Sequence, residues 1–240
     1  MQSTLMISLA MAGLAGAEGA RAQGCEARAG VQPPAVIELY TSEGCSSCPP
    51  ADRWLSSLKG RSDVLALAFH VNYWDRLGWS DRFATPVNTE RQHRLAQKSG
   101  SGYVYTPQVV MNGRDLRDWQ RSTPVPLQPS VVALALRRDG NTVTASVGGT
   151  AGNRRLAGYW AVLEDGHSSR VKAGENAGET LRHDHVVTFY QPVDEWVASG
   201  PAKAWSLALP SVTAGLARRV AFVVTDPASH RPLQALALAC

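Results

Sequence analysis

Two cysteines, Cys45 and Cys48, lie three residues apart between an apolar run and a pair of prolines, and this feature constrains the chain most. The apolar run covers residues 35–40 and predicts a buried strand. The prolines favour the start of a helix, which we expect over residues 51–58. The cysteines therefore lie at a strand-to-helix turn. The unpaired N–H groups and partial positive charge of a helix N-terminus favour a thiolate, which is the reactive form of cysteine.

The first 22 residues have the pattern of a secretory signal. An apolar segment over residues 5–15 is too short to cross a bilayer, and residues 20–22 supply the small side chains that precede a cleavage site. We expect cleavage near Ala22-Gln23 and a secreted or periplasmic protein. A lipoprotein signal is the weaker interpretation, because the residue three before Cys25 is not a larger aliphatic one. No other stretch reaches about 18 apolar residues, so we expect no membrane span in the mature chain.

The chain contains four cysteines, and export favours disulfides between them. Cys45 and Cys48 form one natural pair. Cys25 follows the expected signal directly and Cys240 is the last residue. Because the two ends of a domain are often close together, we expect a structural disulfide between Cys25 and Cys240. Two free terminal thiols are the alternative.

The hydrophobic pattern divides the remaining chain into two parts. A chain of 240 residues is long enough for two domains that each bury a core. In the first, residues 33–125, strands expected at 35–40, 64–71 and 108–111 alternate with helices. The helices are expected at residues 51–58 and 87–98. In the second, residues 126–240, short apolar runs between turn residues predict an all-β sandwich-like domain. These runs are residues 130–137, 142–147, 156–163, 185–190, 204–209, 220–225 and 233–238.

Charge and motifs exclude several classes of function. The net charge of +4 comes from scattered basic residues with no basic stripe, so we expect no nucleic-acid partner. A lone Cys-x-x-Cys lacks the four ligands that structural zinc requires. His183 and His185 lie on one face of a strand, yet no third ligand is near, and an exposed strand end is the simpler interpretation. We expect neither a metal nor a cofactor.

Several motifs resemble those of known dithiol proteins. Tyr40 and Thr41 before the two cysteines resemble glutaredoxin-type spacing in the thioredoxin superfamily, and Thr106-Pro107 resembles the cis-proline that faces the dithiol there. Four stretches taken together are similar to the secreted bacterial family known as domain of unknown function 1223 (DUF1223). These are residues 37–52, 70–79, 106–113 and 174–176. The resemblance implies an α/β thioredoxin-like domain before the β-sandwich-like domain, and little about function.

The turn suggests a role for each side chain if the dithiol is active. Cys45, at the outer end of the turn, is expected to attack as a thiolate, and Cys48 to resolve the mixed disulfide. Pro107 is expected to face the pair. Glu38, in the incoming strand, is a candidate proton acceptor for Cys48, and a structural glutamate is the alternative.

An aromatic loop leaves the second expected strand at the edge of the sheet that also carries Cys45. Tyr73, Trp74 and Trp79 in this loop, together with Thr106, are candidate contacts for a substrate. A satellite core beneath a long loop is the alternative for the tryptophans. His70, at the end of the same strand, is either a proton shuttle or a hydrogen-bonded residue. Residues 174–176 have turn chemistry and would approach the dithiol if the two parts of the chain pack together.

The function that this pattern favours is thiol–disulfide exchange through Cys45 and Cys48, in an enzyme resembling a thiol–disulfide oxidoreductase. The expected partners are protein or small-molecule thiols and disulfides. The alternative is a non-catalytic periplasmic binding or structural module in which the Cys45–Cys48 disulfide is inert. A weaker rival is a metallochaperone that holds a soft ion such as Cu(I) on the two thiolates. The sequence indicates no oligomeric state.

Overall fold

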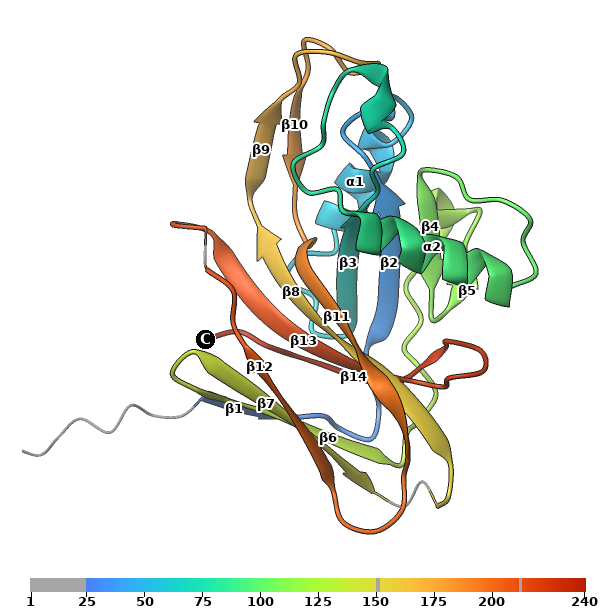
Figure 1. Ribbon diagram of the computed structural model, residues 1–240, viewed down its shortest axis with the longest axis vertical. Helices are drawn as coiled ribbons and strands as arrows, with labels where there is room; N and C mark the ends of the chain where they lie inside the picture. The colour runs from blue at the N-terminus through green and yellow to red at the C-terminus, as the bar shows by residue number, and fades with distance from the viewer. Residues whose placement is uncertain (1–24, 150–151, 212) are drawn as a thin grey trace, which may run out of the picture.

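The computed structural model describes residues 25–149, 152–211 and 213–240 of the chain (Figure 1). The expected signal, residues 1–22, lies outside the described residues. The described part contains fourteen strands, two α-helices and two short 3-10 helices, η1 (Asp75–Leu77) and η2 (Trp119–Arg121). The strands form one eight-stranded, one four-stranded and one two-stranded sheet.

The eight-stranded sheet contains strands from both halves of the chain. In spatial order the strands are β14 (Pro232–Leu238), β13 (Ala217–Thr225), β8 (Arg155–Asp165), β11 (Val186–Val197), β3 (Val64–His70), β2 (Ala35–Thr41), β4 (Gln108–Met111) and β5 (Arg114–Asp115). The two halves join where Val186 of β11 pairs in parallel with Ala68 of β3, and the Ala68 N–H donates to the His185 carbonyl over 2.8 Å.

The predicted fold class, an α/β thioredoxin-like domain followed by a separate β-sandwich, is therefore wrong. The structure is mostly β, and β11 occupies the edge of β3 that an independent α/β domain would leave free or cover by other means. The strands and helices expected from the sequence are each present within a few residues, whereas the strands at residues 25–28, 114–115, 167–170 and 180–183 were not predicted. The pattern predicts which residues are buried, but it does not predict which strands are neighbours.

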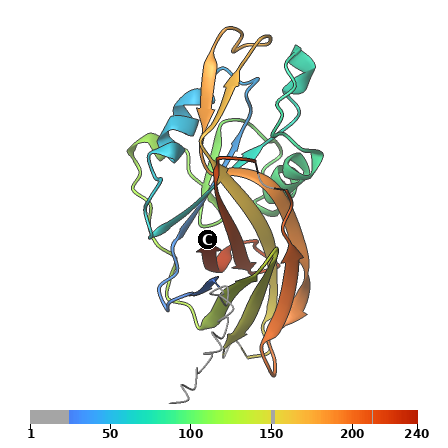
Figure 2. The same cartoon turned by 90° about the vertical axis from the view of Figure 1, so that its left-hand side faces the viewer.

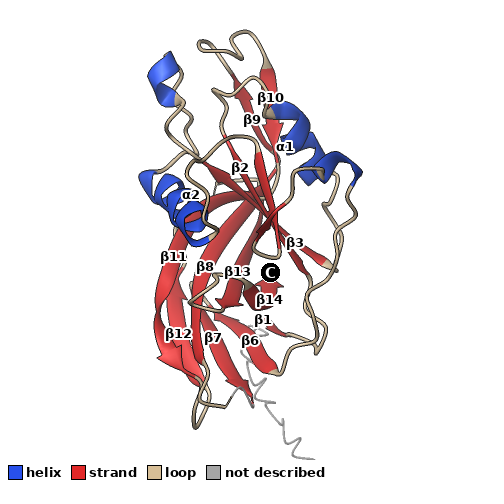
Figure 3. Cartoon of the chain, turned by 90° about the vertical axis from the view of Figure 1, so that its right-hand side faces the viewer, coloured by secondary structure: helices blue, strands red, loops and turns tan. Residues whose placement is uncertain are grey.

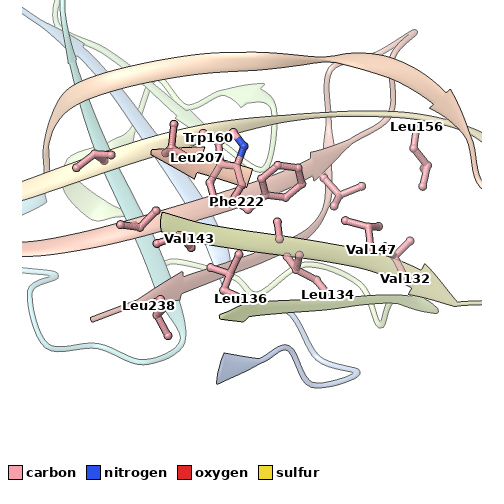
Figure 4. Packing of buried hydrophobic residues seen from close by; sticks show 14 of the residues in the cluster. Val132, Leu134, Leu136, Val143, Val147, Leu156, Trp160, Leu207, Phe222 and Leu238 are labelled. Atoms are coloured by element: carbon pink, nitrogen blue, oxygen red, sulfur yellow. The ribbon is translucent and has the colours of Figure 1, made fainter. Parts of the chain in front are cut away.

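The four-stranded sheet packs over one end of the large sheet. Its strands are β1 (Cys25–Arg28), β6 (Val132–Asp139), β7 (Thr142–Gly149) and β12 (Lys203–Ala208), in the order β1-β6-β7-β12. Between the sheets lies an apolar core in which Trp160 of β8 packs against Phe222 of β13 with ring centroids 4.8 Å apart (Figure 4). Alternate residues of β6 and β7 point into this core, as expected for half-buried strands.

Two helices lie on opposite faces of β2 and β3 (Figure 3). Helix α1 (Pro49–Ser56) packs on the face that carries Ile37 and Leu39, whereas α2 (Pro86–Lys98) packs on the face that carries Tyr40 and Phe69. Each helix begins with proline, which accounts for a start one or two residues before the expected one. This alternation places every odd residue of β2 beneath α1.

A two-stranded hairpin extends from the large sheet alongside α1 (Figures 1 and 3). Its strands, β9 (His167–Arg170) and β10 (Thr180–His183), follow β8 and precede β11. We refer to the loop between them, residues 171–179, as the hairpin tip. Polar residues dominate both strands, so the hydrophobic pattern does not predict them.

Cys25 and Cys240 form the expected disulfide, with Cα atoms 6.3 Å apart. The bond joins the start of β1 to the residue at the end of the sequence, which lies beside it (Figure 2). Among the described residues, no helix combines the length and apolar character that crossing a membrane requires.

Candidate functional site

Cys45 and Cys48 lie in the turn between β2 and α1 and form a disulfide, with Cα atoms 5.4 Å apart. The turn is tight, because the Cys45 N–H donates to the Ser42 carbonyl and the Cys48 N–H donates to the Cys45 carbonyl. Cys48 is the N-cap residue of α1. Both cysteines are completely buried, whereas the two serines between them are exposed. The helix start therefore carries a dithiol that is shielded in the oxidised form.

The hairpin tip covers this turn. The Glu175 carboxylate accepts hydrogen bonds from the Ser46 N–H at 3.0 Å and the Ser46 hydroxyl at 2.8 Å. The buried Asn176 amide donates to the Glu43 carbonyl at 2.8 Å and the Cys45 carbonyl at 3.0 Å. Residues 174–176 thus contact the cysteine turn, which the sequence allowed only on the condition that the two parts of the chain pack together, and these bonds hold the turn closed from outside.

The aromatic loop after β3 supports the turn from another side. A Cβ added to Gly44 would lie 3.0 Å from the Trp74 Cβ, so any larger residue there would require the aromatic loop to shift by a few tenths of an ångström. The Trp74 indole donates to the Thr106 hydroxyl at 2.7 Å, and the Trp79 indole donates to the Glu43 carboxylate at 2.7 Å. The structure therefore brings these predicted contact residues to the edge that holds the dithiol.

Two further predicted residues lie near the same edge. The Thr106–Pro107 peptide bond is cis. Because Gln108 of β4 pairs with Tyr40 of β2, Pro107 lies beside the end of β2 from which the cysteine turn leaves. The Tyr73 hydroxyl points away from the turn toward α2, where it donates to Gln92 over 3.3 Å.

Glu38 lies on the opposite face of β2, beneath α2. Its carboxylate accepts hydrogen bonds from the hydroxyls of Tyr159 at 2.8 Å and Tyr40 at 3.1 Å, and it forms an ion pair with the guanidinium of Arg91. Arg91 also lies over the Tyr159 ring, 4.3 Å from its centroid. The buried pair joins α2 to β2 and β8, and the sheet separates it from α1.

A cluster of five buried ionisable side chains lies on the α1 face, at the carboxyl ends of β2 and β3. Its members are Glu43 of the turn, Asp52 of α1, His70 of β3, Asp81 of the aromatic loop and His183 of β10. We call it the acid–histidine cluster. It resembles the concentrations of perturbed ionisable groups that mark functional sites.

Two close contacts organise this cluster. His70 Nδ1 lies 2.6 Å from the Asp81 carboxylate, with both side chains fully buried. The His183 ring lies between two acids: Nε2 is 3.4 Å from Glu43 and Nδ1 is 3.6 Å from Asp52. Neither contact is aligned as a hydrogen bond, so both nitrogens of His183 lack a hydrogen-bond partner within the described chain.

Burial and pairing move the pKa values of the cluster in different directions. Burial lowers the pKa of His70, but Asp81 outweighs it and raises that pKa above its usual value. Burial raises the pKa of Asp81, but His70 holds it below the usual value. For Asp52, burial dominates over the attraction of His183 and His70, and the pKa is raised. Asp81 is therefore an ionised partner of His70, whereas Asp52 is held closer to protonation.

The structure corrects the interpretation of His183 and His185 as an exposed strand end, because each is only 2% exposed. Both face the interior where the hairpin returns to the large sheet. The acids approach His183 from opposite sides of its ring, so they do not converge on one point. Accordingly, no group of three or more His, Cys, Asp or Glu side chains among the described residues is arranged to hold a metal ion.

Two members of the cluster, Asp52 and Asp81, were given no role from the sequence, and His183 was considered only as a metal ligand or part of an exposed strand end. Asp52 had a usable signal, because it follows Cys48 by four residues on a helix and so shares its face. Asp81 had none, since its partner is set by the path of a long loop. The position of His183 within the cluster could be predicted only by predicting the hairpin.

Comparison with known proteins assigns a family. A family profile described as protein of unknown function (DUF1223) matches residues 36–225. A crystal structure of protein AGR_C_4864 from Agrobacterium tumefaciens is 26% identical, with a TM-score of 0.62, and the match covers 85% of this chain and 93% of that one. HBP35 of Porphyromonas gingivalis, 15% identical with a TM-score of 0.58 over 86% of this chain and 74% of that one, shares the fold. No curated protein matches significantly. The chain therefore belongs to the DUF1223 family.

Proposed function

We propose that the protein carries out thiol–disulfide exchange through Cys45 and Cys48 with protein or small-molecule thiols and disulfides. The observation that carries the proposal is a dithiol at the N-terminus of α1 with an acid–histidine cluster buried behind it. The two disulfides also support our inference that the chain is exported to an oxidising compartment. The spacing of Tyr40, Thr41 and the cysteines supports kinship of this motif with dithiol motifs of the thioredoxin superfamily.

The proposed reaction proceeds in two displacements. In the reduced protein the Cys45 thiolate attacks a partner disulfide, forms a mixed disulfide and releases one partner sulfur as a thiolate. Cys48 then loses its proton, attacks the Cys45 sulfur and expels the second partner thiolate. Two electrons pass from the protein dithiol to the partner disulfide. The same steps in reverse oxidise a partner dithiol.

Replacing Cys48 by serine is expected to trap the first displacement. Without a second thiol, the mixed disulfide on Cys45 has no intramolecular route to resolution. Incubation of reduced Cys48→Ser protein with oxidised glutathione should therefore give a stable adduct of one glutathione, detected by intact mass and removed by dithiothreitol. The wild-type protein should instead return to its Cys45–Cys48 disulfide. Cys45→Ser protein is the matched control, and equal labelling of both variants would contradict the assigned order of attack.

One observation favours the alternative of an inert structural bond, namely the complete burial of both cysteines. The two functions differ in reduction potential. A structural disulfide of an exported protein has a potential below about −300 mV, whereas an exchanging one is easier to reduce. A redox titration of the Cys45–Cys48 pair against glutathione buffers separates them. A potential below that limit would assign the bond a structural role.

Truncation of the Asn176 side chain, which holds the hairpin tip over the cysteine turn, is expected to accelerate reduction of the Cys45–Cys48 disulfide. Asn176→Ala removes two hydrogen bonds to turn carbonyls, each contributing about 1 kcal/mol, so opening of the tip should become roughly tenfold or more frequent. The rate of reduction by dithiothreitol should rise in proportion. Glu179→Ala is the matched control, because Glu179 is an exposed residue of the same tip. An unchanged rate in the Asn176 variant would indicate that the tip does not limit access.

A further inference from the structure

We propose that Asp52 accepts the proton of Cys48 when Cys48 resolves the mixed disulfide. This inference rests on the proposed exchange function and assigns it a residue that the sequence reasoning did not select. Asp52 lies one helical turn after Cys48, and its N–H donates to the Cys48 carbonyl over 3.1 Å. Residues four apart on a helix have Cβ atoms about 5–6 Å apart on the same face.

The direction and burial of Asp52 bring its carboxylate toward the cysteine. Side chains on a helix lean toward its N-terminus, which for Asp52 is the direction of Cys48. Asp52 is 7% exposed and Cys48 is completely buried, so bulk water is a poor acceptor for a proton leaving this thiol. A buried carboxylate one helical turn away is an acceptor that can take the place of water.

Each element packed around Asp52 contributes a group that acts on it. Thr41 of β2 supplies a hydroxyl, His70 of β3 and His183 of β10 supply imidazoles, and the aromatic loop supplies Asp81. Glu43 of the turn contacts the other nitrogen of the His183 ring. The His183 ring is the nearest ionic partner, 3.6 Å away. Burial raises the pKa of Asp52, which moves it closer to the pKa of a thiol and makes it a better acceptor.

Glu38 lacks these properties. It lies on the other face of β2, and Arg91 and two tyrosine hydroxyls bind its oxygens.

In the proposed step the proton moves from Cys48 Sγ to the Asp52 carboxylate, and the new thiolate attacks Cys45 Sγ. The Cys45–Cys48 bond forms as the mixed disulfide breaks, and the partner sulfur leaves with the electron pair.

The experiment follows both displacements in one trace. Reduced protein is mixed with 5,5′-dithiobis(2-nitrobenzoate), which releases one coloured thiolate when Cys45 attacks and a second when Cys48 resolves the adduct. In Asp52→Asn protein the first phase should be unchanged, whereas the second should slow by about tenfold or more at pH 6–7. The difference should vanish at pH values where the thiol ionises without help. Asp52→Glu should recover part of the rate, and Asp63→Asn, at an exposed aspartate before β3, should match the wild type.

A second variant keeps the test independent of how well Asp52→Asn folds. His183 attracts the ionised form of Asp52 and so lowers its pKa. His183→Gln should therefore move the acidic limb of the second-phase profile to higher pH. A folded Asp52→Asn protein with a wild-type second phase at every pH, or an unmoved limb in His183→Gln, would overturn the inference. A Cys48→Ser protein that forms no adduct would overturn the exchange function itself, and this inference with it.

Discussion

Replacing both Cys25 and Cys240 by serine is expected to lower the free energy of unfolding by about 5 kcal/mol. The disulfide closes a loop of 215 residues, and the entropy that a crosslink removes from the unfolded chain grows with the logarithm of loop length. The native structure also loses an anchor, because β1 is an edge strand that pairs only with β6. Without the bond, β1 is held by its four paired residues and by the packing of residues such as Ala27 and Ala29 on the core between the sheets.

Urea unfolding of the wild-type and double-serine proteins measures this effect through the transition midpoint at constant slope. The second disulfide provides the matched control within the same chain. Cys45 and Cys48 are separated by three residues, for which the same relation gives about 2 kcal/mol. We therefore expect the Cys25/Cys240 variant to be the less stable of the two double-serine proteins. The reverse order would show that the terminal disulfide does not restrict the unfolded chain as proposed.

Acidification between pH 6.5 and 4 is expected to cost about 3 kcal/mol of stability through His185 alone. Burial, followed by the charge of Arg219, lowers the pKa of His185 to about 4, against 6.5 when unfolded. The unfolded state therefore binds the proton more tightly. The stabilisation is fully present above pH 6.5 and is lost as the pH falls through this window.

The contacts of His185 explain the direction. Arg219 donates to Nδ1 over 2.8 Å, which requires that this nitrogen carry no proton. Protonation removes that acceptor and places a cation beside the guanidinium. The His185 carbonyl also accepts a hydrogen bond from the Ala68 N–H where β11 joins β3. His185 therefore lies at the junction of the two halves of the large sheet.

His185→Asn is the variant that tests this pH dependence. His185 has a φ of 59°, and asparagine tolerates that left-handed conformation better than most residues. The variant should lose most of the difference in unfolding free energy between pH 7 and pH 4.5. His93→Asn, on the exposed surface of α2, should retain it. A variant at position 185 with the wild-type pH dependence would assign the acid sensitivity to other groups.

Local structure was predictable here to the extent that it is determined by local chemistry. The apolar run of β2, the prolines that open α1 and the turn residues between the sandwich strands each act over a few residues, and the corresponding elements are present. The pairing of Cys25 with Cys240 was predicted from the place of Cys25 just after the expected signal and of Cys240 as the last residue of the sequence. Which strands pair with each other could not be predicted from local sequence. The hydrogen bond between Ala68 and His185, for example, links residues 117 positions apart, and no local pattern indicates it.

The same distinction between local and long-range features holds for the candidate site. The cysteines and their aromatic neighbours were found because each lies at the end of a predicted strand. The burial of His183 beside Asp52 was not predicted, because β9 and β10 are short and polar and neither carries a hydrophobic signature. Glu38 was selected for its position in a strand near the cysteines, but alternation along β2 directs it to the α2 face, where Arg91 holds it.

The hairpin has a consequence for how the dithiol site is assembled. It is an insertion between β8 and β11, two central strands of the large sheet, yet it supplies Asn176 to the cysteine turn and His183 to the acid beside it. The surroundings of the dithiol are thus built by two distant stretches of one chain. Replacing residues 126–240 would remove Asn176 and His183 from the site, together with the strands β8 and β11 that continue the sheet beyond β3. Residues 33–125, which carry the cysteine motif, therefore do not form this site without residues 126–240.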